Sequence, residues 1–363
     1  MGFAMPSIPG TASRPDRRAA RLSRRSFLRL LAIGSAGLAG CGLAPRAPTT
    51  STGALTPAPR PSLAPAPQVE AGRVIPVDDL YVKSYLRTPE LVPRENWQIQ
   101  LGGQMRQAHT LTWSELQSFP LVEQMHTMEC IGNPVGGRLL GNLVWQGVSL
   151  RALLALANPT PASDHLMISG VDDYFTCVPL DLAMDERSML AFSVGGQPLP
   201  HTHGYPVRVL LPGVYGQKQP KWVIALEAVT GAQPGTWERQ GWSDQAIIQV
   251  NSRIEYPRDG ASIPAGQRLP VSGVAFADTS GVARVEVSVD GGLNWSDAKV
   301  YPGPSTMAWT VWEWDWAAPA AGQHTIKARA TSGAGQTQVD AGGFLANVFP
   351  NGTSSIHSIV VTV

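Results

Sequence analysis

The sequence predicts an α+β fold, in which a mixed α+β domain is followed by a β-sandwich of immunoglobulin type. Between residues 71 and 240, segments with helical and strand periodicity are mixed without regular β-α-β alternation. From residue 241 to 363, short alternating strands are separated by glycine-containing turns. Only 15% of the residues are charged, whereas 37 are glycine and 31 are proline, a composition that favours strands and loops over long surface helices.

The length and charge of the chain exclude several classes of function. With 363 residues, the chain can form two domains with sizeable cores. It contains 28 lysines and arginines against 27 aspartates and glutamates, so no basic excess indicates a nucleic-acid partner. Three cysteines, Cys41, Cys130 and Cys177, are too few for a disulfide framework. No Gly-x-Gly-x-x-Gly or Walker motif indicates a nucleotide cofactor.

Residues 1–41 have the order of a bacterial export signal. A basic region over residues 14–29 includes the pair Arg24-Arg25, and an apolar stretch over residues 30–38 is too short to span a bilayer comfortably. The paired arginines are typical of a twin-arginine signal, which addresses proteins that are exported in the folded state. The alternative is a chance basic stretch in a disordered leader. Folded export suits a protein whose cofactor is inserted in the cytoplasm, so the leader favours a complex metal cofactor.

The leader ends in Leu38-Ala39-Gly40-Cys41, which resembles a bacterial lipobox. In that interpretation the Cys41 thiol is lipidated, and the alternative is an ordinary cleavage site with an incidental cysteine. Residues 42–70 are rich in Pro, Ala, Thr and Ser, so they predict a disordered tether. The sequence therefore predicts a protein anchored by lipid on the outer face of the cytoplasmic membrane, in the periplasm or at the cell surface.

Residues 71–240 contain the elements of the first domain. A strand is expected over 97–101, ended by two glycines, and a short helix is expected to begin after Thr112, with Glu115 three residues on. A second helix is expected within 148–157, because its leucines recur at helical spacing and Asn158-Pro159 would stop it. Two further segments, 206–211 and 222–229, have the apolar character of buried strands.

Residues 241–363 contain the alternating segments of the predicted sandwich. Turns such as Asp259-Gly260 and Asp290-Gly291-Gly292 separate them, and the paired cysteines of antibody domains are absent, so only the architecture is predicted. Strands are expected over 247–250, 269–276, 282–289, 310–316, 324–330 and 358–363.

Cys130 is the first candidate for chemistry. It ends an alternating run that begins at His126, and a Gly/Pro loop over residues 132–137 follows it. A thiolate suits a soft metal centre, although a lone cysteine is more often a small buried apolar residue. These residues alone leave both interpretations open.

A basic cluster is the second candidate. His203 and Arg208 flank a glycine turn, and Lys218 and Lys221 follow in a domain that is otherwise poor in charge. An arginine fork, lysine charges and turn amides together can bind a phosphate. His201 and His203 could instead form a metal pair, but no acid or third histidine accompanies them closely. A solvated basic loop is the structural alternative.

Several of these motifs, in this order, resemble the molybdopterin-binding domain of the sulfite oxidase family, and the resemblance covers nearly everything from about 75 to 335. The segment over 288–295 resembles part of the family's later dimerisation domain. The motifs that carry the resemblance are Cys130 with its loop, 142–150, Asp172-Asp173-Tyr174, 196–200, His203-Gly204-Tyr205-Pro206-Val207-Arg208 and Lys221-Trp222.

The resemblance implies a role for each matching residue. Cys130 would be the protein ligand of molybdenum, the rest of the metal site coming from the pterin dithiolene, with Lys83 and Tyr174 as catalytic neighbours. Cys177 matches no ligand position and is expected in the core. The expected cofactor-binding residues are Tyr81, Val82, Lys83, Cys130, Asp173, His203, Arg208, Gln219, Pro220 and Lys221.

The chain also departs from the family pattern. Lys83 stands where sulfite oxidases have arginine, and Ser84 and Tyr85 stand where they have asparagine and histidine. Pro134 and Val135 replace arginines after the cysteine loop. Because planar guanidinium recognition of a small oxyanion is reduced, the resemblance implies the cofactor more firmly than it implies sulfite.

The sequence thus predicts a molybdenum oxidoreductase that transfers an oxygen atom or two electrons to or from a small substrate. No Cys-x-x-Cys-His haem motif is present, so a separate electron carrier, such as a cytochrome or a membrane subunit, is expected. A homodimer is expected from the resemblance. The alternatives are a sulfoxide reductase of the exported branch and a non-catalytic lipoprotein binding module.

Overall fold

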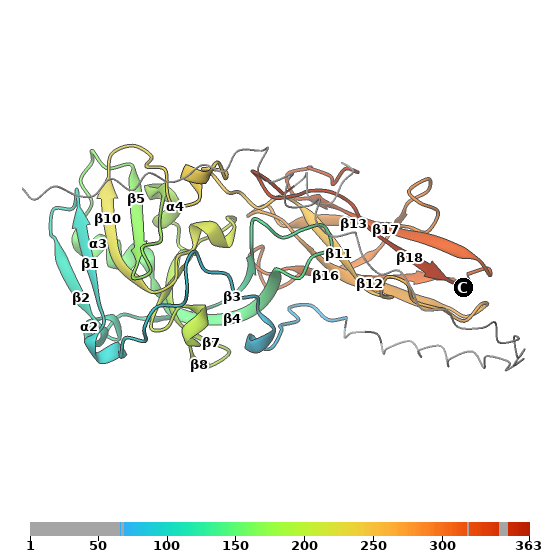
Figure 1. Cartoon of the computed structure of the whole chain (residues 1–363), viewed down its shortest axis with the longest axis horizontal. Helices are drawn as coiled ribbons and strands as arrows, with labels where there is room; N and C mark the ends of the chain where they lie inside the picture. The colour runs from blue at the N-terminus through green and yellow to red at the C-terminus, as the bar shows by residue number, and fades with distance from the viewer. Residues whose placement is uncertain (1–65, 67–68, 318, 341–347) are drawn as a thin grey trace, which may run out of the picture. The chain divides into compact units, whose positions relative to one another are not determined.

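The computed structural model describes residues 66, 69–317, 319–340 and 348–363 (Figure 1). The expected export signal, Cys41 and almost all of the expected tether lie outside the described residues. Within the described part of the chain, no helix is both long enough and apolar enough to cross a membrane.

The first domain is built on two sheets. One has the order β2-β1-β10-β5-β6, and in it β1 pairs with β10 in parallel. The other has the order β3-β4-β7-β8, and β7 also pairs with β9. The strands are β1 (Gln98–Gly103), β2 (His109–Thr112), β3 (Leu121–Glu129), β4 (Leu140–Ser149), β5 (His165–Gly170), β6 (Phe175–Pro179), β7 (Met189–Val194), β8 (Gln197–Pro198), β9 (Arg208–Leu210) and β10 (Val223–Val229).

The helices of this domain are few and short, and the two predicted ones are confirmed. Helix α2 (Trp113–Leu116) begins with the expected capping box, in which Thr112 and Glu115 bond each other's main-chain N–H groups. Helix α3 (Leu150–Ala157) buries its leucine stripe and ends at Asn158, whose φ is 54°. The other helices are α4 (Leu180–Ala183), η1 (Val77–Asp79), η2 (Arg94–Asn96), η3 (His201–His203), η4 (Gly216–Lys218) and η5 (Glu238–Gln240).

The cores of the first domain explain the placement of these elements. One apolar cluster joins β1, β10 and β5 to the inner face of α3, where Leu150, Leu153 and Leu154 are fully buried. A second cluster, centred on Trp145, lies under β3, β4 and β7. The predicted α+β class is confirmed, with strands as the dominant element.

The second domain consists of two four-stranded antiparallel sheets, as predicted for a sandwich. Their orders are β11-β12-β16-β15 and β14-β13-β17-β18, and the fully buried Trp312 lies in the apolar core of this domain. The strands are β11 (Asn251–Tyr256), β12 (Leu269–Phe276), β13 (Val282–Ser288), β14 (Ser296–Asp297), β15 (Lys299–Tyr301), β16 (Thr310–Trp316), β17 (Gln323–Ser332) and β18 (His357–Thr362).

One predicted strand of this domain is wrong. Residues 247–250 form only an isolated bridge between Ile247 and Val214, and the first strand begins at Asn251. Ile248 and Val250 are buried as their apolar character suggests. The Ile248 amide, however, bonds the carbonyl of Gly213 in the first domain rather than a neighbouring strand. The segment is therefore a packed connection between the domains.

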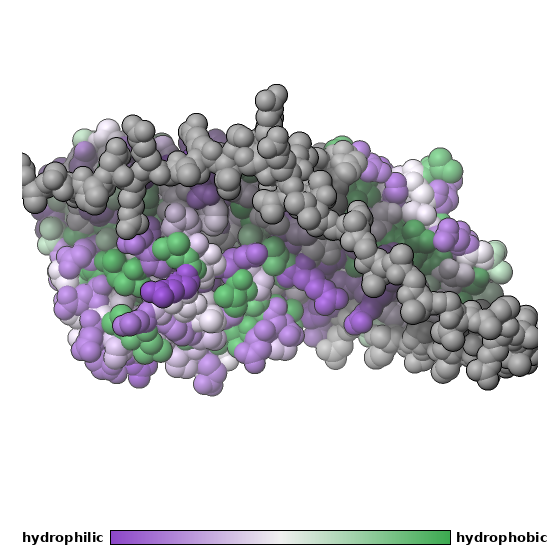
Figure 2. Space-filling model, in the orientation of Figure 1, coloured by the Kyte–Doolittle hydropathy of each residue, from purple (hydrophilic) through white to green (hydrophobic). Residues whose placement is uncertain are grey.

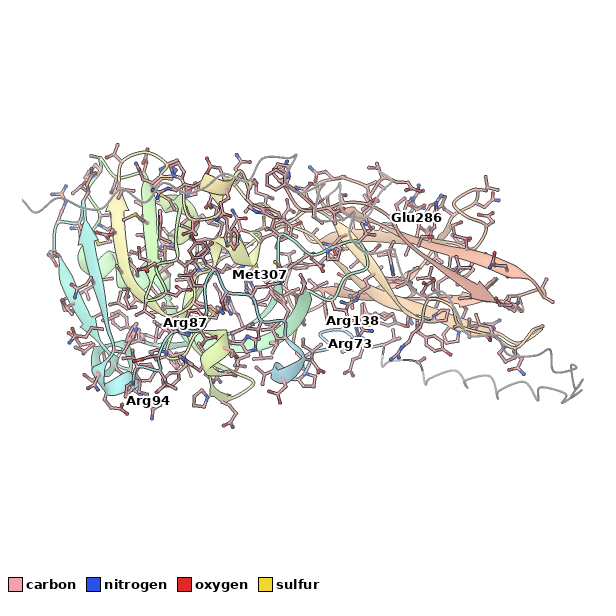
Figure 3. All side chains as sticks on the ribbon, viewed as in Figure 1. Arg73, Arg87, Arg94, Arg138, Glu286 and Met307 are labelled. Atoms are coloured by element: carbon pink, nitrogen blue, oxygen red, sulfur yellow. The ribbon has the colours of Figure 1, made fainter. Side chains whose placement is uncertain are left out.

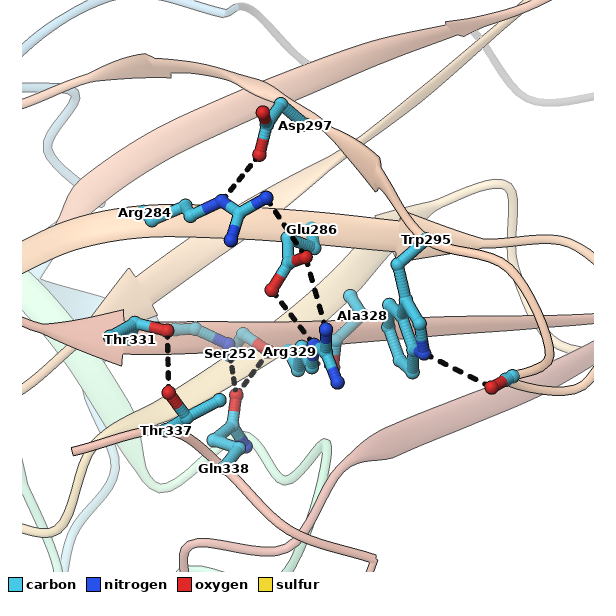
Figure 4. A network of polar contacts seen from close by, with 12 residues as sticks. Ser252, Arg284, Glu286, Trp295, Asp297, Ala328, Arg329, Thr331, Thr337 and Gln338 are labelled. Atoms are coloured by element: carbon cyan, nitrogen blue, oxygen red, sulfur yellow. Dashed lines mark hydrogen bonds and ion pairs between the residues drawn. The ribbon is translucent and has the colours of Figure 1, made fainter. Parts of the chain in front are cut away.

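A polar network ties together strands of the β14-β13-β17-β18 sheet (Figure 4). Glu286 on β13 accepts two hydrogen bonds, of 2.8 and 3.0 Å, from the Arg329 guanidinium on β17, and Arg284 pairs with both Glu286 and Asp297. Arg329 also lies 4.2 Å from the ring centroid of Trp295. On the face drawn in Figure 2, hydrophilic and hydrophobic residues are intermixed over the described part of the chain.

Candidate active site

A cavity of about 360 Å³ opens in the first domain around Cys130. Its walls come from the segment before β1, the end of β3 with its loop, the end of β5, and the stretch from η3 to η5. The lining residues are Leu80, Tyr81, Lys83, Ser84, Tyr85, Met128, Cys130, Ile131, Gly132, Leu139, Asp172, Tyr174, His203, Arg208, Gly216, Gln217, Gln219, Pro220, Lys221, Trp237 and Trp242.

Nearly all of the predicted site residues meet in this cavity, although they are far apart in sequence. Tyr81, Lys83, Cys130, Tyr174, His203, Arg208, Gln219, Pro220 and Lys221 line it. Val82 and Asp173 do not. Val82 is half-exposed, and Asp173 is an exposed turn residue with a φ of 62°. Its neighbour Asp172 lines the wall instead, buried at 9% exposure.

The Cys130 loop is closed by its own hydrogen bonds. The Cys130 amide donates to the Leu139 carbonyl at 3.0 Å, and the Asn133 amide donates to the Cys130 carbonyl at 2.9 Å. The Asn133 side chain accepts from the Leu139 amide at 3.0 Å, which joins the two ends of the loop. Burial raises the pKa of the Cys130 thiol, while the Gly132 backbone and the charge of Lys83 act in the opposite direction.

The basic wall is centred on Arg208, whose side chain is almost fully buried. Its guanidinium donates to the carbonyls of His203 and Gln219, each at 3.2 Å, and its Nε atom has no partner in the described structure. A Cβ at Gly204 would come within 3.1 Å of the Cβ atoms of Arg208 and Lys221. Glycine at this position, with φ 113°, therefore lets the two basic side chains approach each other.

The basic groups compete with one another for protons. Burial and the neighbouring Arg208 lower the pKa of Lys221 to about 7, and burial followed by Arg208 and Lys221 lowers that of His203 to about 4. Burial alone lowers the pKa of Arg208 to about 10. An anion that binds in a buried basic cluster of this kind stabilises the protonated forms of its members. The cavity therefore fits a phosphate-bearing group at this wall and a soft metal at Cys130.

Tyr174 and Tyr81 also line the cavity, and both lie close enough to Cys130 for its charge to act on them. The Tyr174 hydroxyl donates to the Gln217 carbonyl at 2.5 Å, which fixes its ring. Burial, followed by nearby negative groups, raises the pKa of Tyr174 well above its ordinary value, and burial does the same for Tyr81. Both hydroxyls therefore stay protonated and can donate hydrogen bonds.

Aromatic residues for which no role was predicted line a further part of the cavity. Tyr85 meets Trp237 edge-on, with ring centroids 5.6 Å apart, and lies 6.4 Å from Tyr174. A Cβ built at Gly132 would be 3.9 Å from both the Cys130 Sγ and the Cη2 atom of Trp242. The high tryptophan content was the only available signal, and it did not indicate which tryptophans lie here.

Other polar residues of the first domain lie outside the cavity. Arg87 and Arg138, labelled in Figure 3, are described but do not line it. His126 is buried, and burial and Arg208 lower its pKa to about 3, so it is neutral. Glu129 is buried directly before Cys130, and burial raises its pKa to about 7. No role had been expected for Glu129.

Comparisons with known proteins agree with this architecture. Residues 85–237 match the model of the oxidoreductase molybdopterin binding domain, and residues 251–328 match the model of a bacterial Ig domain. The chain is 30% identical over 160 residues to an uncharacterized oxidoreductase, YuiH, of Bacillus subtilis, covering 44% of this chain and 79% of that protein. It is 29% identical over 283 residues to human mitochondrial sulfite oxidase, covering 66% of this chain and 52% of that protein.

Among solved structures, the sulfane dehydrogenase SoxCD of Paracoccus pantotrophus has the same fold, with a TM-score of 0.65, 22% identity and coverage of 76% of this chain and 79% of that chain. Fold and cavity thus define an oxidoreductase with a molybdopterin-binding domain and an Ig-like domain. The chain belongs to the sulfite oxidase family. It spans about half the length of the mammalian sulfite oxidases that it matches.

Proposed function

We propose that this chain is a molybdenum-cofactor-dependent oxidoreductase, which transfers an oxygen atom or two electrons to or from a small substrate. The observation that carries the proposal is the meeting of the Cys130 thiol with the basic side chains of His203, Arg208 and Lys221 in one cavity. A soft ligand and an anion site side by side match the two ends of a metal-binding pterin phosphate. Family membership disfavours a non-catalytic binding module.

In this proposal each wall has a distinct task. Cys130 would ligate the metal, while Arg208, Lys221 and the peptide groups around Gln219 would hold the pterin phosphate. The cofactor supplies the two-electron redox step when bound. Tyr174, whose one O–H proton goes to the Gln217 carbonyl, would contact the substrate through its ring and hydroxyl oxygen, and Lys83 would supply a positive charge beside the thiolate.

The lining of the cavity favours a substrate that is larger or less anionic than sulfite. Tyr85, Trp237 and Trp242 give it an aromatic wall, and Lys83 is the basic side chain whose charge lowers the pKa of the thiol. Aromatic faces favour apolar or weakly charged groups, whereas a small dianion needs several directed donors. This observation supports the second candidate, reduction of a sulfoxide, alongside oxidation of a small sulfur compound.

The location and the partners are also part of the proposal. The paired arginines before the apolar stretch, and Cys41 after it, support twin-arginine export and lipid anchoring outside the cytoplasmic membrane. No haem attachment motif occurs in the sequence, so electrons would pass to a separate carrier.

The second domain supports a homodimer, because its Ig-like fold follows the catalytic domain and twofold association is the commonest assembly. Light scattering at micromolar concentration is expected to give twice the chain mass. A monomer would contradict this part of the proposal.

The function as a whole is tested by molybdenum and pterin analysis of the purified chain, followed by a screen of sulfur substrates with artificial electron donors and acceptors. A bound molybdopterin and turnover of at least one such substrate are expected. Protein that is folded and metal-free after expression with molybdate and cofactor-synthesis genes would contradict the proposal.

A further inference from the structure

The residue before Cys130 is held by the second domain. The Glu129 carboxylate accepts hydrogen bonds of 3.2 and 3.0 Å from the side-chain amide of Asn251, which begins strand β11. A third hydrogen bond, of 3.0 Å, comes from Asn133 inside the cysteine loop. Glu129 is only 2% exposed, so these amides replace its hydration.

The far side of the same loop is also fixed from the second domain. Arg253, two residues along β11, donates to the Gly137 carbonyl at 2.9 Å. His357 on β18 lies against Gly136, where a Cβ would come within 2.2 Å of the imidazole Nε2 atom. Gly136 has a φ of 67°, so the position requires glycine both for its conformation and for this close approach.

Strand β3 itself is bonded to the second domain two residues earlier. The Thr127 amide donates to the Met307 carbonyl at 2.8 Å, and the Thr127 hydroxyl accepts from the Trp309 amide at 2.9 Å. Cys130 therefore lies between points of attachment at Thr127, Glu129 and Gly137. Its loop cannot shift toward or away from the cavity without breaking hydrogen bonds to the second domain.

We propose that Asn251 is a positioning residue of the active site, which acts through Glu129 to fix the Cys130 sulfur in the cavity. The second domain would then help to position the metal ligand, in addition to its proposed role in dimerisation. The inference rests on the proposed role of Cys130 as the metal ligand. Partners that orient a metal ligand typically change affinity or activity by roughly 10–100-fold when removed, which sets the expected size of the effect.

The test compares two substitutions on adjacent positions of β11 in the full chain. Asn251→Leu keeps the branched shape of the side chain but removes the donor to Glu129. Ser252→Ala is the matched control, because the buried Ser252 hydroxyl bonds the Ala328 carbonyl and the Gln338 side chain inside the sandwich rather than Glu129. Asn251→Asp is a second, nearly isosteric variant that removes the amide donor and places a second carboxyl group against Glu129.

The first measurement is the rate of Cys130 alkylation by iodoacetamide in cofactor-free full-length protein. A several-fold change is expected in Asn251→Leu and Asn251→Asp, but not in Ser252→Ala. The second measurement is made on the holoenzyme. There kcat is expected to fall roughly 10-fold or more with little change in KM. The electron paramagnetic resonance spectrum of the partly reduced protein is expected to shift in the Asn251 variants alone.

Unchanged alkylation in both Asn251 variants would overturn the proposal, and so would an equal change in Ser252→Ala, which would show a general loosening of β11. The alkylation experiment needs no cofactor. A wild-type protein without molybdenum would therefore contradict the proposed function, while this measurement would still decide the role of Asn251.

Discussion

The guanidinium of Arg208 lies 5.4 Å from the ring centroid of the fully buried Trp145. The indole of Trp145 is itself fixed, because its Nε1 donates to the His126 carbonyl at 3.0 Å on strand β3. An aromatic face stabilises a buried cation without neutralising it. Arg208, on strand β9, therefore presents a pre-oriented positive charge to the cavity. Its Nε–H group has no hydrogen-bond partner in the described structure.

Arg208→Ala is expected to lower cofactor content more than stability. Loss of a charge-assisted contact to the pterin phosphate costs about 2–3 kcal/mol of binding free energy. The measurement is pterin per chain in the purified variant, with Arg268→Ala as control because Arg268 forms an exposed ion pair with Asp315 in the second domain. Full pterin occupancy in Arg208→Ala would refute the assigned contact.

Anion binding to the cofactor-free protein is expected to weaken with rising pH. Burial and Arg208 lower the pKa of Lys221 to about 7, so above that pH an anion must bind together with a proton. Affinity for inorganic phosphate is then expected to fall by up to about tenfold per pH unit between pH 8 and 10.

Isothermal calorimetry of wild type and Lys221→Met checks this expectation. The variant should bind phosphate weakly, with little slope across the same range of pH. A wild-type affinity that does not change between pH 8 and 10 would argue against a neutral Lys221 in the empty cavity.

Sulfite is expected to be a poor substrate. Lys83 supplies charge without a planar fork, and Arg87 and Arg138 do not line the cavity. Two missing guanidinium contacts weaken dianion binding by about 3–5 kcal/mol, a factor of hundreds or more. Steady-state kinetics on fully metallated protein test this, with Lys83→Arg expected to improve sulfite turnover. Rapid wild-type turnover with a low micromolar KM would show that these departures do not matter.

Cys41→Ala is expected to release the protein from membranes without loss of activity. A flexible tether would keep the folded domains independent of a lipid anchor. Membrane fractionation after a high-salt wash, with activity measured in each fraction, checks the outcome. Retention of the variant on membranes would contradict the lipobox interpretation.

Local periodicity was enough to predict the short elements that carry their own signals. The capping box at Thr112 and Glu115, the leucine stripe of α3 and the strand 269–276 were all recognisable, because each depends on neighbours in sequence. The strand over 247–250 was wrongly predicted for the same reason. Its apolar alternation reflects burial between the domains, and a strand also needs a partner that local sequence does not reveal.

The candidate site could be predicted where its residues belong to recognisable motifs or have distinctive chemistry. Cys130, Arg208 and Lys221 were identified through their motifs, and all three line the cavity. Glu129 and Asn251 were not, since their roles depend on a contact across 122 positions of sequence. Buried hydrogen bonds between distant polar residues leave no local pattern, so the support of the cysteine loop was visible only in the fold.

Molybdenum K-edge X-ray absorption of the wild type and of Cys130→Ser tests the central claim most directly. Serine is nearly isosteric with cysteine but is a poorer ligand for a soft metal, so the variant should remain folded and lose turnover. The wild-type metal is expected to show one more sulfur ligand than the metal in the variant. Identical sulfur coordination in the two proteins, with activity retained in Cys130→Ser, would contradict Cys130 as the metal ligand.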